Sequence, residues 1–438
     1  MWVKRYSLAD AVKDTGGRLL GRFDDVSIEI PYIEQNTERL KGGSMFLPYK
    51  GRNVDGHEFI EDALRMGCIG CLTEKELQSY MDDKFYILVD DVVDAEWKII
   101  ASKLRERSTK VICVTGSVGK TTTTGMIANV LRQKYSVFQT VGNKNDEYLG
   151  GEIAFQISDD FQYAVIEMGM GMESSVINMA KAIRPEMIVF TNIGYAHIEK
   201  TGSLEATRDE KCGTEKWLAD HGLAVVNCDD PLLMSYEYTH QVVKYGREKG
   251  DWKFLDHVVY PQRAAFTVGR ICGLDDTEIC EGIMSFKNET GRMDVIHLER
   301  MTLIDSSFNA SVASVNNALD YLGAFPMTRI AVIGDMLEVG SYAEHVHNLV
   351  GRHVSKENTD VLIAVGSHGT DVIHGVFDKD VEKHLAPDLS TAEEILRSVI
   401  ERCSDGPPTV LIKGSHGSGV YMIAEKIRRG DFWNGKEN

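Results

Sequence analysis

A buried strand, a glycine-rich turn and a helix follow one another over residues 110–134, and this unit constrains the fold more than any other segment. The apolar run Val111–Val114 predicts the strand, and residues 121–134 have a helical pattern. The turn between them reads Thr115-Gly116-Ser117-Val118-Gly119-Lys120-Thr121. Glycines allow backbone N–H groups to surround phosphate oxygens, and the N-terminus of the helix adds its positive dipole end. The unit therefore predicts a nucleotide phosphate site on a parallel sheet.

The side chains of this turn have distinct expected roles. Lys120 is expected to reach the terminal phosphates, and Thr121 to ligate Mg²⁺. Further nucleotide contacts are expected from Gly116, Ser117, Gly119 and Thr122. The full phosphate-loop pattern would have glycine where Val114 stands, but a merely flexible turn would not explain a lysine followed directly by threonines.

A second nucleotide motif leads to a different interpretation, which we reject. Residues Asn143–Asp146 spell the guanine-reading sequence of GTPases. In that class the motif follows further strands and a switch segment, whereas here it follows the phosphate loop by one helix.

Alternating strands and helices continue along the chain and divide it into three predicted α/β domains. At about 150 residues per domain, 438 residues are enough for three. We predict a small N-terminal α/β domain over 1–84 and a central parallel-sheet domain with the phosphate loop over 85–296. For residues 297–438 we predict a Rossmann-like domain, because three apolar runs there each end in glycine (330–334, 361–366 and 410–414).

Charge and composition exclude several classes of function. Lys and Arg number 48 against 66 Asp and Glu, for a net charge of −18, so we expect neither nucleic-acid binding nor a motor that follows a track. No apolar stretch approaches the about 20 residues of a membrane span, and no secretory leader is recognised. The eight cysteines are scattered, and the Cys68/Cys71 pair lacks the second half of a zinc site. We expect a cytoplasmic, monomeric protein without membrane insertion.

The order of further motifs resembles the Mur ligase family of ATP-dependent amide-bond ligases. After the shortened phosphate loop come Gly142-Asn143, Ile166–Gly169 and Thr191–His197. Later segments match family motifs as well: Gly51–Phe59, Val226–Pro231, Thr290–Arg292, Asp305–Ala310, Gly334–Gly340 and Lys413–Ser415. The resemblance covers nearly the whole chain.

The resemblance implies a metal-assisted ligation. Thr121 and Glu167 would hold one Mg²⁺, and His197 a second beside Lys211, which occupies the place of a carbamylated lysine. Lys120, Lys211, Glu167 and His197 would be the catalytic residues. A carboxylate must approach the γ-phosphate, and positive charge is needed because the two anions repel each other. An amine would then attack the resulting acylphosphate.

The remaining site residues are also carried by the resemblance. It implies nucleotide contacts from Asn192, Asn227, Arg292 and Asp305. It implies contacts with the other small-molecule substrates from Asn36, Thr37, Lys50, Asn143, Asn309 and Lys413. The N-terminal domain would bind the acceptor.

Several substrate motifs depart from the family pattern. Asn36-Thr37-Glu38 stands where an acid, a hydroxyl residue and arginine are usual. Ser306, Ser311 and His416 replace an aspartate, an asparagine and an arginine. The ATP and metal motifs are retained, whereas the substrate motifs differ.

These observations favour an enzyme most like those that add D-alanyl-D-alanine to UDP-N-acetylmuramoyl-tripeptide during peptidoglycan precursor synthesis. The first alternative is a related ligase of a specialised pathway with another acceptor. The second is a non-catalytic, nucleotide-gated binding protein, which could lose Glu167, His197 and Lys211. All three residues are present, and this favours the enzyme.

Overall fold

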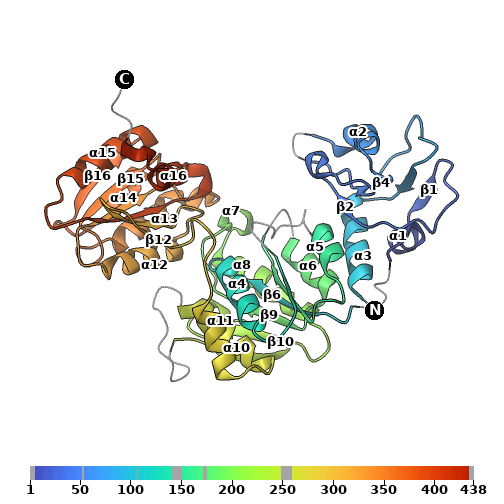
Figure 1. The fold of residues 1–438 in the computed structure, drawn as a ribbon, viewed down its shortest axis with the longest axis horizontal. Helices are drawn as coiled ribbons and strands as arrows, with labels where there is room; N and C mark the ends of the chain where they lie inside the picture. The colour runs from blue at the N-terminus through green and yellow to red at the C-terminus, as the bar shows by residue number, and fades with distance from the viewer. Residues whose placement is uncertain are drawn as a thin grey trace.

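The computed structural model describes residues 5–51, 54–105, 107–140, 150–170, 175–247 and 259–433. Within them the chain forms three sheets, and Figure 1 shows the three bodies in chain order, with the central one between the other two. We name them the N-terminal, central and C-terminal domains after their sheets. All three combine helices with mostly parallel strands, as predicted. No described helix is long and apolar enough to cross a membrane.

The N-terminal sheet has the strand order β1-β5-β4-β3-β2. Only β1 and β5 pair in antiparallel fashion among its described neighbours. The strands are β1 (Arg18–Leu20), β2 (Ile33–Glu34), β3 (Met45–Phe46), β4 (Gly70–Thr73) and β5 (Phe85–Leu88). Helix α1 (Leu8–Thr15) begins at a capping box of Ser7 and Asp10 and packs on one face, and α2 (Ile60–Arg65) packs on the other.

Helix α3 (Val92–Arg105) belongs to two hydrophobic cores. Ile99 packs with Phe85 in the N-terminal core. Ile100 and Leu104, on the next side of the helix, pack in the central core. The helix contacts α1 in the N-terminal domain and both α5 (Gly150–Gln156) and α6 (Ser175–Ile183) in the central domain. One helix therefore joins the two domains.

Both predicted domain boundaries differ from the sheet pairing. The boundary after residue 84 excludes β5, which pairs with β4 and β1 and so belongs to the N-terminal sheet. The boundary after residue 296 divides β12 (Asp294–His297), which pairs with β13 of the C-terminal sheet. An apolar run predicts a strand, but its partner is chosen by contacts that are distant in sequence.

The central sheet is parallel throughout, with the order β11-β10-β9-β6-β8-β7. Its strands are apolar because helices cover both faces: α4, α10 and α11 on one, α3, α5 and α6 on the other. The bounds are β6 (Lys110–Thr115), α4 (Lys120–Leu131), β7 (Val137–Gln139), α5 (Gly150–Gln156), β8 (Tyr163–Glu167), α6 (Ser175–Ile183), β9 (Met187–Phe190), α7 (Ile198–Thr201), α8 (Leu204–Cys212), β10 (Leu223–Asn227), α9 (Pro231–Met234), β11 (Gln241–Tyr245), α10 (Val259–Ile271) and α11 (Asp276–Met284).

The C-terminal sheet has the order β12-β13-β17-β14-β15-β16, in which β12 is the antiparallel edge strand. Helices α12, α13 and α14 cover one face, and α15 and α16 the other. The remaining bounds are β13 (Thr302–Asp305), α12 (Val312–Gly323), β14 (Arg329–Ile333), α13 (Ala343–His353), β15 (Val361–Val365), α14 (Gly369–Gly375), β16 (Glu382–Ala386), α15 (Leu389–Glu401), β17 (Thr409–Lys413) and α16 (Tyr421–Arg429).

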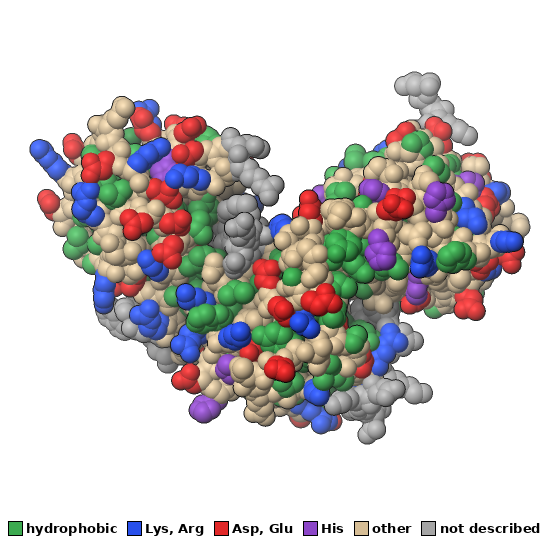
Figure 2. Space-filling model, turned by 180° about the vertical axis from the view of Figure 1, so that it is seen from behind, with side chains coloured by type: hydrophobic (Ala, Val, Ile, Leu, Met, Phe, Trp, Pro, Cys, Tyr) green, Lys and Arg blue, Asp and Glu red, His purple; other side chains and the backbone are tan. Residues whose placement is uncertain are grey.

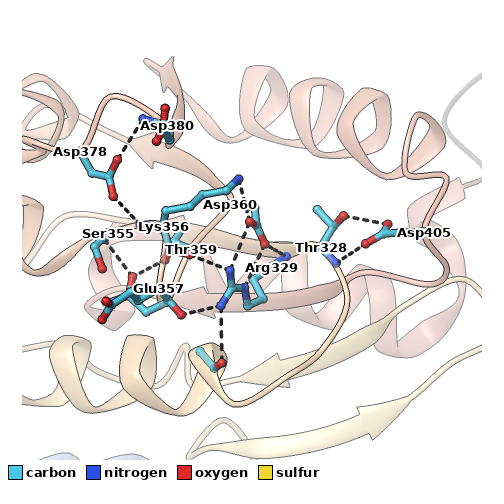
Figure 3. A network of polar contacts seen from close by, with 12 residues as sticks. Thr328, Arg329, Ser355, Lys356, Glu357, Thr359, Asp360, Asp378, Asp380 and Asp405 are labelled. Carbon is cyan, nitrogen blue, oxygen red and sulfur yellow. Dashed lines mark hydrogen bonds and ion pairs between the residues drawn. The ribbon is translucent and has the colours of Figure 1, made fainter.

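Charged side chains join the starts of the C-terminal strands (Figure 3). Asp360, directly before β15, accepts a hydrogen bond from Arg329 Nε at 2.9 Å and pairs with Lys356 Nζ at 2.8 Å. Beside them, Thr328 Oγ1 donates to Asp405 at 2.8 Å. Polar contacts thus occupy this edge of the sheet. The opposite edge, where parallel strands end, is the usual place for a ligand.

Candidate active site

The phosphate loop joins β6 to α4, as predicted, and close packing requires one of its glycines. Gly116 has a φ of 144°, and a Cβ there would lie 2.0 Å from Thr191 Oγ1. Gly119 caps α4 in the left-handed conformation, with a φ of 79°. Both positions therefore favour residues without a side chain.

The segment after β9 holds the loop in place. Asn192 accepts from Val118 N–H through Oδ1 at 2.9 Å and donates to Val118 O through Nδ2 at 3.1 Å. Ser117 N–H donates to Asn192 O at 2.9 Å, and Gly194 N–H donates to Ser117 Oγ at 2.8 Å. Asn192 was predicted to contact nucleotide. Its side chain positions the loop that would do so.

Two side chains whose oxygen atoms could ligate a metal meet behind the loop. Thr121 Oγ1 donates to Glu167 Oε2 at 2.6 Å, and both residues are buried. Glu167 stands at the end of β8, where its backbone N–H donates to Thr140 Oγ1 at 2.9 Å. A hydroxyl and a carboxylate suit Mg²⁺, which usually takes one or two protein ligands together with substrate phosphates. The pair therefore fits the predicted first metal position.

Lys211 lies at the end of α8 and is fully buried. Its Nζ has no hydrogen-bond partner among the described residues. Burial, and then the positive charge of Lys120, lower the pKa of Lys211 to about 7. Burial likewise lowers the pKa of Lys120, with Arg292 acting in the same direction and Glu167 opposing it. The two lysines thus act on each other electrostatically, at a point where positive charge is concentrated.

His197 pairs with a residue that the motif analysis did not single out. Its Nδ1 lies 2.7 Å from Glu338 Oε2, which comes from the loop after β14 in the C-terminal domain. Among the described residues, no group of three His, Cys, Asp or Glu side chains is arranged to hold a metal. The four predicted metal-site residues are therefore not one ready cluster: Thr121 meets Glu167, and His197 meets Glu338.

A cleft of about 460 Å³ lies between the central and C-terminal domains. Most of the predicted site residues line it, and the nearby Gly116 supports its wall. The predicted residues that line it are Ser117, Gly119, Lys120, Thr121, Thr122, Glu167, Asn192, His197, Arg292, Asn309 and Lys413. From behind, Figure 2 shows the molecule hollowed between its outer domains, with acidic and basic side chains interspersed over them.

Two predicted nucleotide contacts instead bind the chain itself. Asn227 donates to Thr191 O at 2.9 Å and does not line the cleft. Asp305 accepts from Ser307 Oγ at 2.6 Å and from Arg428 Nε at 2.8 Å. In this arrangement the Asn227 carboxamide and the Asp305 carboxylate stabilise loops at strand ends, and their contact with nucleotide stays a prediction.

The predicted N-terminal substrate residues lie apart from this cleft. Asn36 caps a short helical turn that contains Thr37. Lys50 pairs with Glu74. Asn36, Thr37 and Lys50 do not line any of the described pockets. Asn143 lies outside the described residues.

The motif analysis missed a basic pocket beside Asn36 and Thr37. A hollow of about 360 Å³ contains two basic residues and one acidic residue, and its lining is Tyr32, Ile33, Glu34, Arg39, Lys41 and Ser44 of the N-terminal domain and Phe155 of α5. Arg39 directly follows Glu38, the acid that stands where the family pattern has arginine. The adjacent basic residue was the signal that could have identified this pocket.

Comparisons with known proteins identify the family. Residues 114–279 match the Mur ligase middle domain, and residues 291–416 match the Mur ligase glutamate ligase domain. A UDP-N-acetylmuramoyl-tripeptide–D-alanyl-D-alanine ligase of Synechocystis is 31% identical over 372 residues, which are 79% of this chain and 82% of that protein. The chain belongs to the Mur ligase family. As a Mur ligase, it is an ATP-dependent enzyme that forms amide bonds, and the predicted resemblance is confirmed.

Other relatives of this Mur ligase extend over nearly the full chain. The enzyme of the same name from Bacillus subtilis is 28% identical over 90% of this chain and 92% of its own. MurF from Acinetobacter baumannii has a TM-score of 0.87 at 21% identity, covering 97% of this chain and 99% of that chain. MurF ligase from Thermotoga maritima, determined in complex with ADP, has a TM-score of 0.79 at 25% identity, over 92% and 97%. The predicted three-domain fold is confirmed.

Proposed function

We propose that this protein joins D-alanyl-D-alanine to UDP-N-acetylmuramoyl-tripeptide, with conversion of ATP to ADP and phosphate, in the synthesis of peptidoglycan precursors. The observation that carries the proposal is the cleft in which Lys120, Glu167, Arg292 and Lys413 from two domains face one space. The names of the relatives supply the substrates.

The cleft supports transfer of a phosphoryl group to a carboxylate. Lys120 would neutralise the terminal phosphates, while the acceptor carboxylate oxygen bonds to the γ-phosphorus and ADP leaves. The amine of D-alanyl-D-alanine would then attack the acyl carbon and lose a proton, and phosphate would leave. Thr121 and Glu167 would hold Mg²⁺, which supplies charge neutralisation at the phosphates when bound.

The C-terminal wall contributes further positive charge. Lys413 Nζ donates to Asn309 O at 2.9 Å and to Ser306 Oγ at 3.2 Å. Burial and the nearby Arg292 lower the pKa of Lys413 to about 7, against the opposing effect of Asp305. The Arg292 guanidinium lies 4.1 Å from the centre of the Phe308 ring. We propose that Arg292 contacts nucleotide phosphate and that Lys413 and Asn309 contact the peptide substrates.

The basic N-terminal pocket supports an anionic acceptor. Arg39 and Lys41 could pair with the diphosphate of a UDP-linked substrate, and Tyr32 and Phe155 offer apolar contact to a base or sugar. In this proposal Arg39 performs the role that the family pattern gives to an arginine at position 38. Glu38 is then compatible with a UDP-linked acceptor.

We propose that Lys211 is carbamylated in the active enzyme. An uncharged amine is the form that reacts with CO₂, releasing a proton as the carbamate forms. Complete burial, the unpartnered Nζ and a pKa near 7 support this reactivity. The new negative charge would offset Lys120. A second Mg²⁺ held by this carbamate and His197 is part of the same proposal.

We further propose that the enzyme acts as a monomer in the cytoplasm. All eight cysteines are free thiols, which is usual in a reducing compartment.

The first experiment is mass spectrometry of the products formed with ATP, Mg²⁺, UDP-N-acetylmuramoyl-tripeptide and D-alanyl-D-alanine. We expect a UDP-linked pentapeptide from the wild type and at least a 100-fold lower yield from Lys120→Ala, because the phosphates lose their charge partner. Lys134→Ala, at an exposed position after α4, is the matched lysine control. If ATP is consumed only with other peptide acceptors, the substrates differ and a specialised ligase is favoured.

A further inference from the structure

Two residues with unusual backbone conformations meet at the boundary between the central and C-terminal domains. His197, directly before α7, and Glu338, after β14, both have a φ of 61°. Histidine tolerates this left-handed region better than glutamate does, and either residue keeps it only where its surroundings hold it. His197 Nδ1 and Glu338 Oε2 lie 2.7 Å apart. Both residues line the cleft.

The short distance assigns a proton to one ring nitrogen. An ionised carboxylate can only accept a hydrogen bond, and two lone pairs 2.7 Å apart would repel, so this contact favours the form of the ring with a proton on Nδ1. In the neutral ring with a proton on Nδ1, Nε2 has a free lone pair.

The C-terminal domain fixes the position of the glutamate. Directly before it in the chain, Met336 N–H donates to His347 Nε2 at 2.8 Å and Leu337 N–H donates to Ser415 Oγ at 3.0 Å. On its other side, Gly340 packs so closely on the central domain that a Cβ would lie 3.0 Å from Glu199 Cγ. Glu338 reaches His197 because both contacts hold its loop at the domain boundary.

We propose that Glu338 is a positioning residue that fixes the Nδ1-protonated tautomer of His197 from across the domain boundary and so presents Nε2 to a divalent cation. Histidines that ligate metals commonly donate their other ring N–H to a carboxylate. Here the carboxylate belongs to a different domain, so the His197 ring is oriented for a cation only when the C-terminal domain is docked on the central domain. The inference rests on the proposed function in that it takes His197 as a cation ligand.

The tautomer can be measured without metal or substrate. In protein labelled with ¹⁵N-histidine, ring nitrogen shifts distinguish the two neutral forms, and His197→Gln identifies the His197 signals. We expect the Nδ1-protonated form in the wild type and a shift towards the Nε2-protonated form in Glu338→Ala. Glu338→Gln retains an oxygen acceptor and should largely retain the wild-type form. An unchanged His197 spectrum in Glu338→Ala would overturn the proposal.

A second measurement separates positioning from simple domain contact. Tyr342→Phe removes another bond across the same boundary, from Tyr342 Oη to Gly202 O at 3.0 Å, without touching His197. We expect Mn²⁺ affinity, measured by electron paramagnetic resonance, to fall 10- to 100-fold in Glu338→Ala and to stay unchanged in Tyr342→Phe. Equal losses in both variants would contradict a role through His197. Because neither readout uses the peptide substrates, a failed ligation assay would leave this inference standing.

Discussion

A side chain at position 116 would collide with the segment that holds the phosphate loop. In Gly116→Ala, the new Cβ would lie 2.0 Å from Thr191 Oγ1, on a backbone whose φ of 144° already disfavours alanine. The loop must move, and we expect ADP affinity to fall at least tenfold, equivalent to about 1.4 kcal/mol. Titration calorimetry with ADP measures this loss.

Gly42→Ala is the matched control, since a Cβ at this exposed position meets nothing within 4 Å. It should bind ADP like the wild type. An unchanged affinity in Gly116→Ala would mean that the contact with Thr191 does not determine the shape of the loop.

Individual residues also show where sequence reasoning succeeds and fails. The convergence of Lys120, Thr121 and Glu167 on one cleft was predictable because the order of strand, loop and helix fixes where such side chains meet. The internal partners of Asn227 and Asp305 were not predictable, because a motif gives proximity to a site but not the direction of a side chain. Both found backbone or side-chain partners within the protein. Glu338 was also missed as a partner of His197, because the pair depends on the docking of two domains.

At the scale of elements, the polar network before β14 and β15 gives the C-terminal sheet a defined acid sensitivity. Burial disfavours the charge on Asp360, but hydrogen bonds from Arg329 and Lys356 outweigh this effect and lower its pKa from 3.8 to about 2. A lowered carboxyl pKa stabilises the fold above pH 4, and this contribution is lost as the pH falls towards 2. We expect Asp360→Asn to lower the free energy of unfolding by about 1–3 kcal/mol at pH 7. Urea unfolding followed across this pH range measures the difference.

The difference in free energy of unfolding between the wild type and Asp360→Asn should therefore decrease as the pH falls from 4 to 2. Glu394→Gln, at an exposed position in α15, should match the wild type throughout. A gap that is independent of pH would indicate packing rather than charge.

The same strands show the limit of pattern reading for elements. Apolar runs identified β6, β14, β15 and β17, and their parallel arrangement followed from the helices between them. The predicted domain boundaries after residues 84 and 296 separate β5 from its sheet and divide β12, because strand pairing is settled by distant neighbours such as β1 and β13.

For the whole molecule, the shared helix α3 predicts that the N-terminal and central domains lose structure together. Ile99→Ala leaves a cavity in the N-terminal core, at a cost of about 2–5 kcal/mol. Because a loosened α3 also withdraws Ile100 and Leu104 from the central core, amide exchange should rise in β6 and β8 as well as in β4. Hydrogen exchange with mass spectrometry resolves these strands.

Leu396→Ala, in a core of the C-terminal domain, should instead raise exchange only in the C-terminal sheet. If Ile99→Ala affects β4 and β5 alone, the two domains are stable independently and α3 is merely a connection.

The bonds between Asn192 and the phosphate loop have a consequence for the thermodynamics of nucleotide recognition. Because the tail of β9 already restricts the backbone of Ser117 and Val118, the arrival of a nucleotide orders little additional chain. The entropy loss occurs when the polypeptide folds, not when the ligand docks. A residue at position 192 without a carboxamide would lose the two side-chain bonds to Val118, and we expect it to weaken association chiefly through a less favourable entropy.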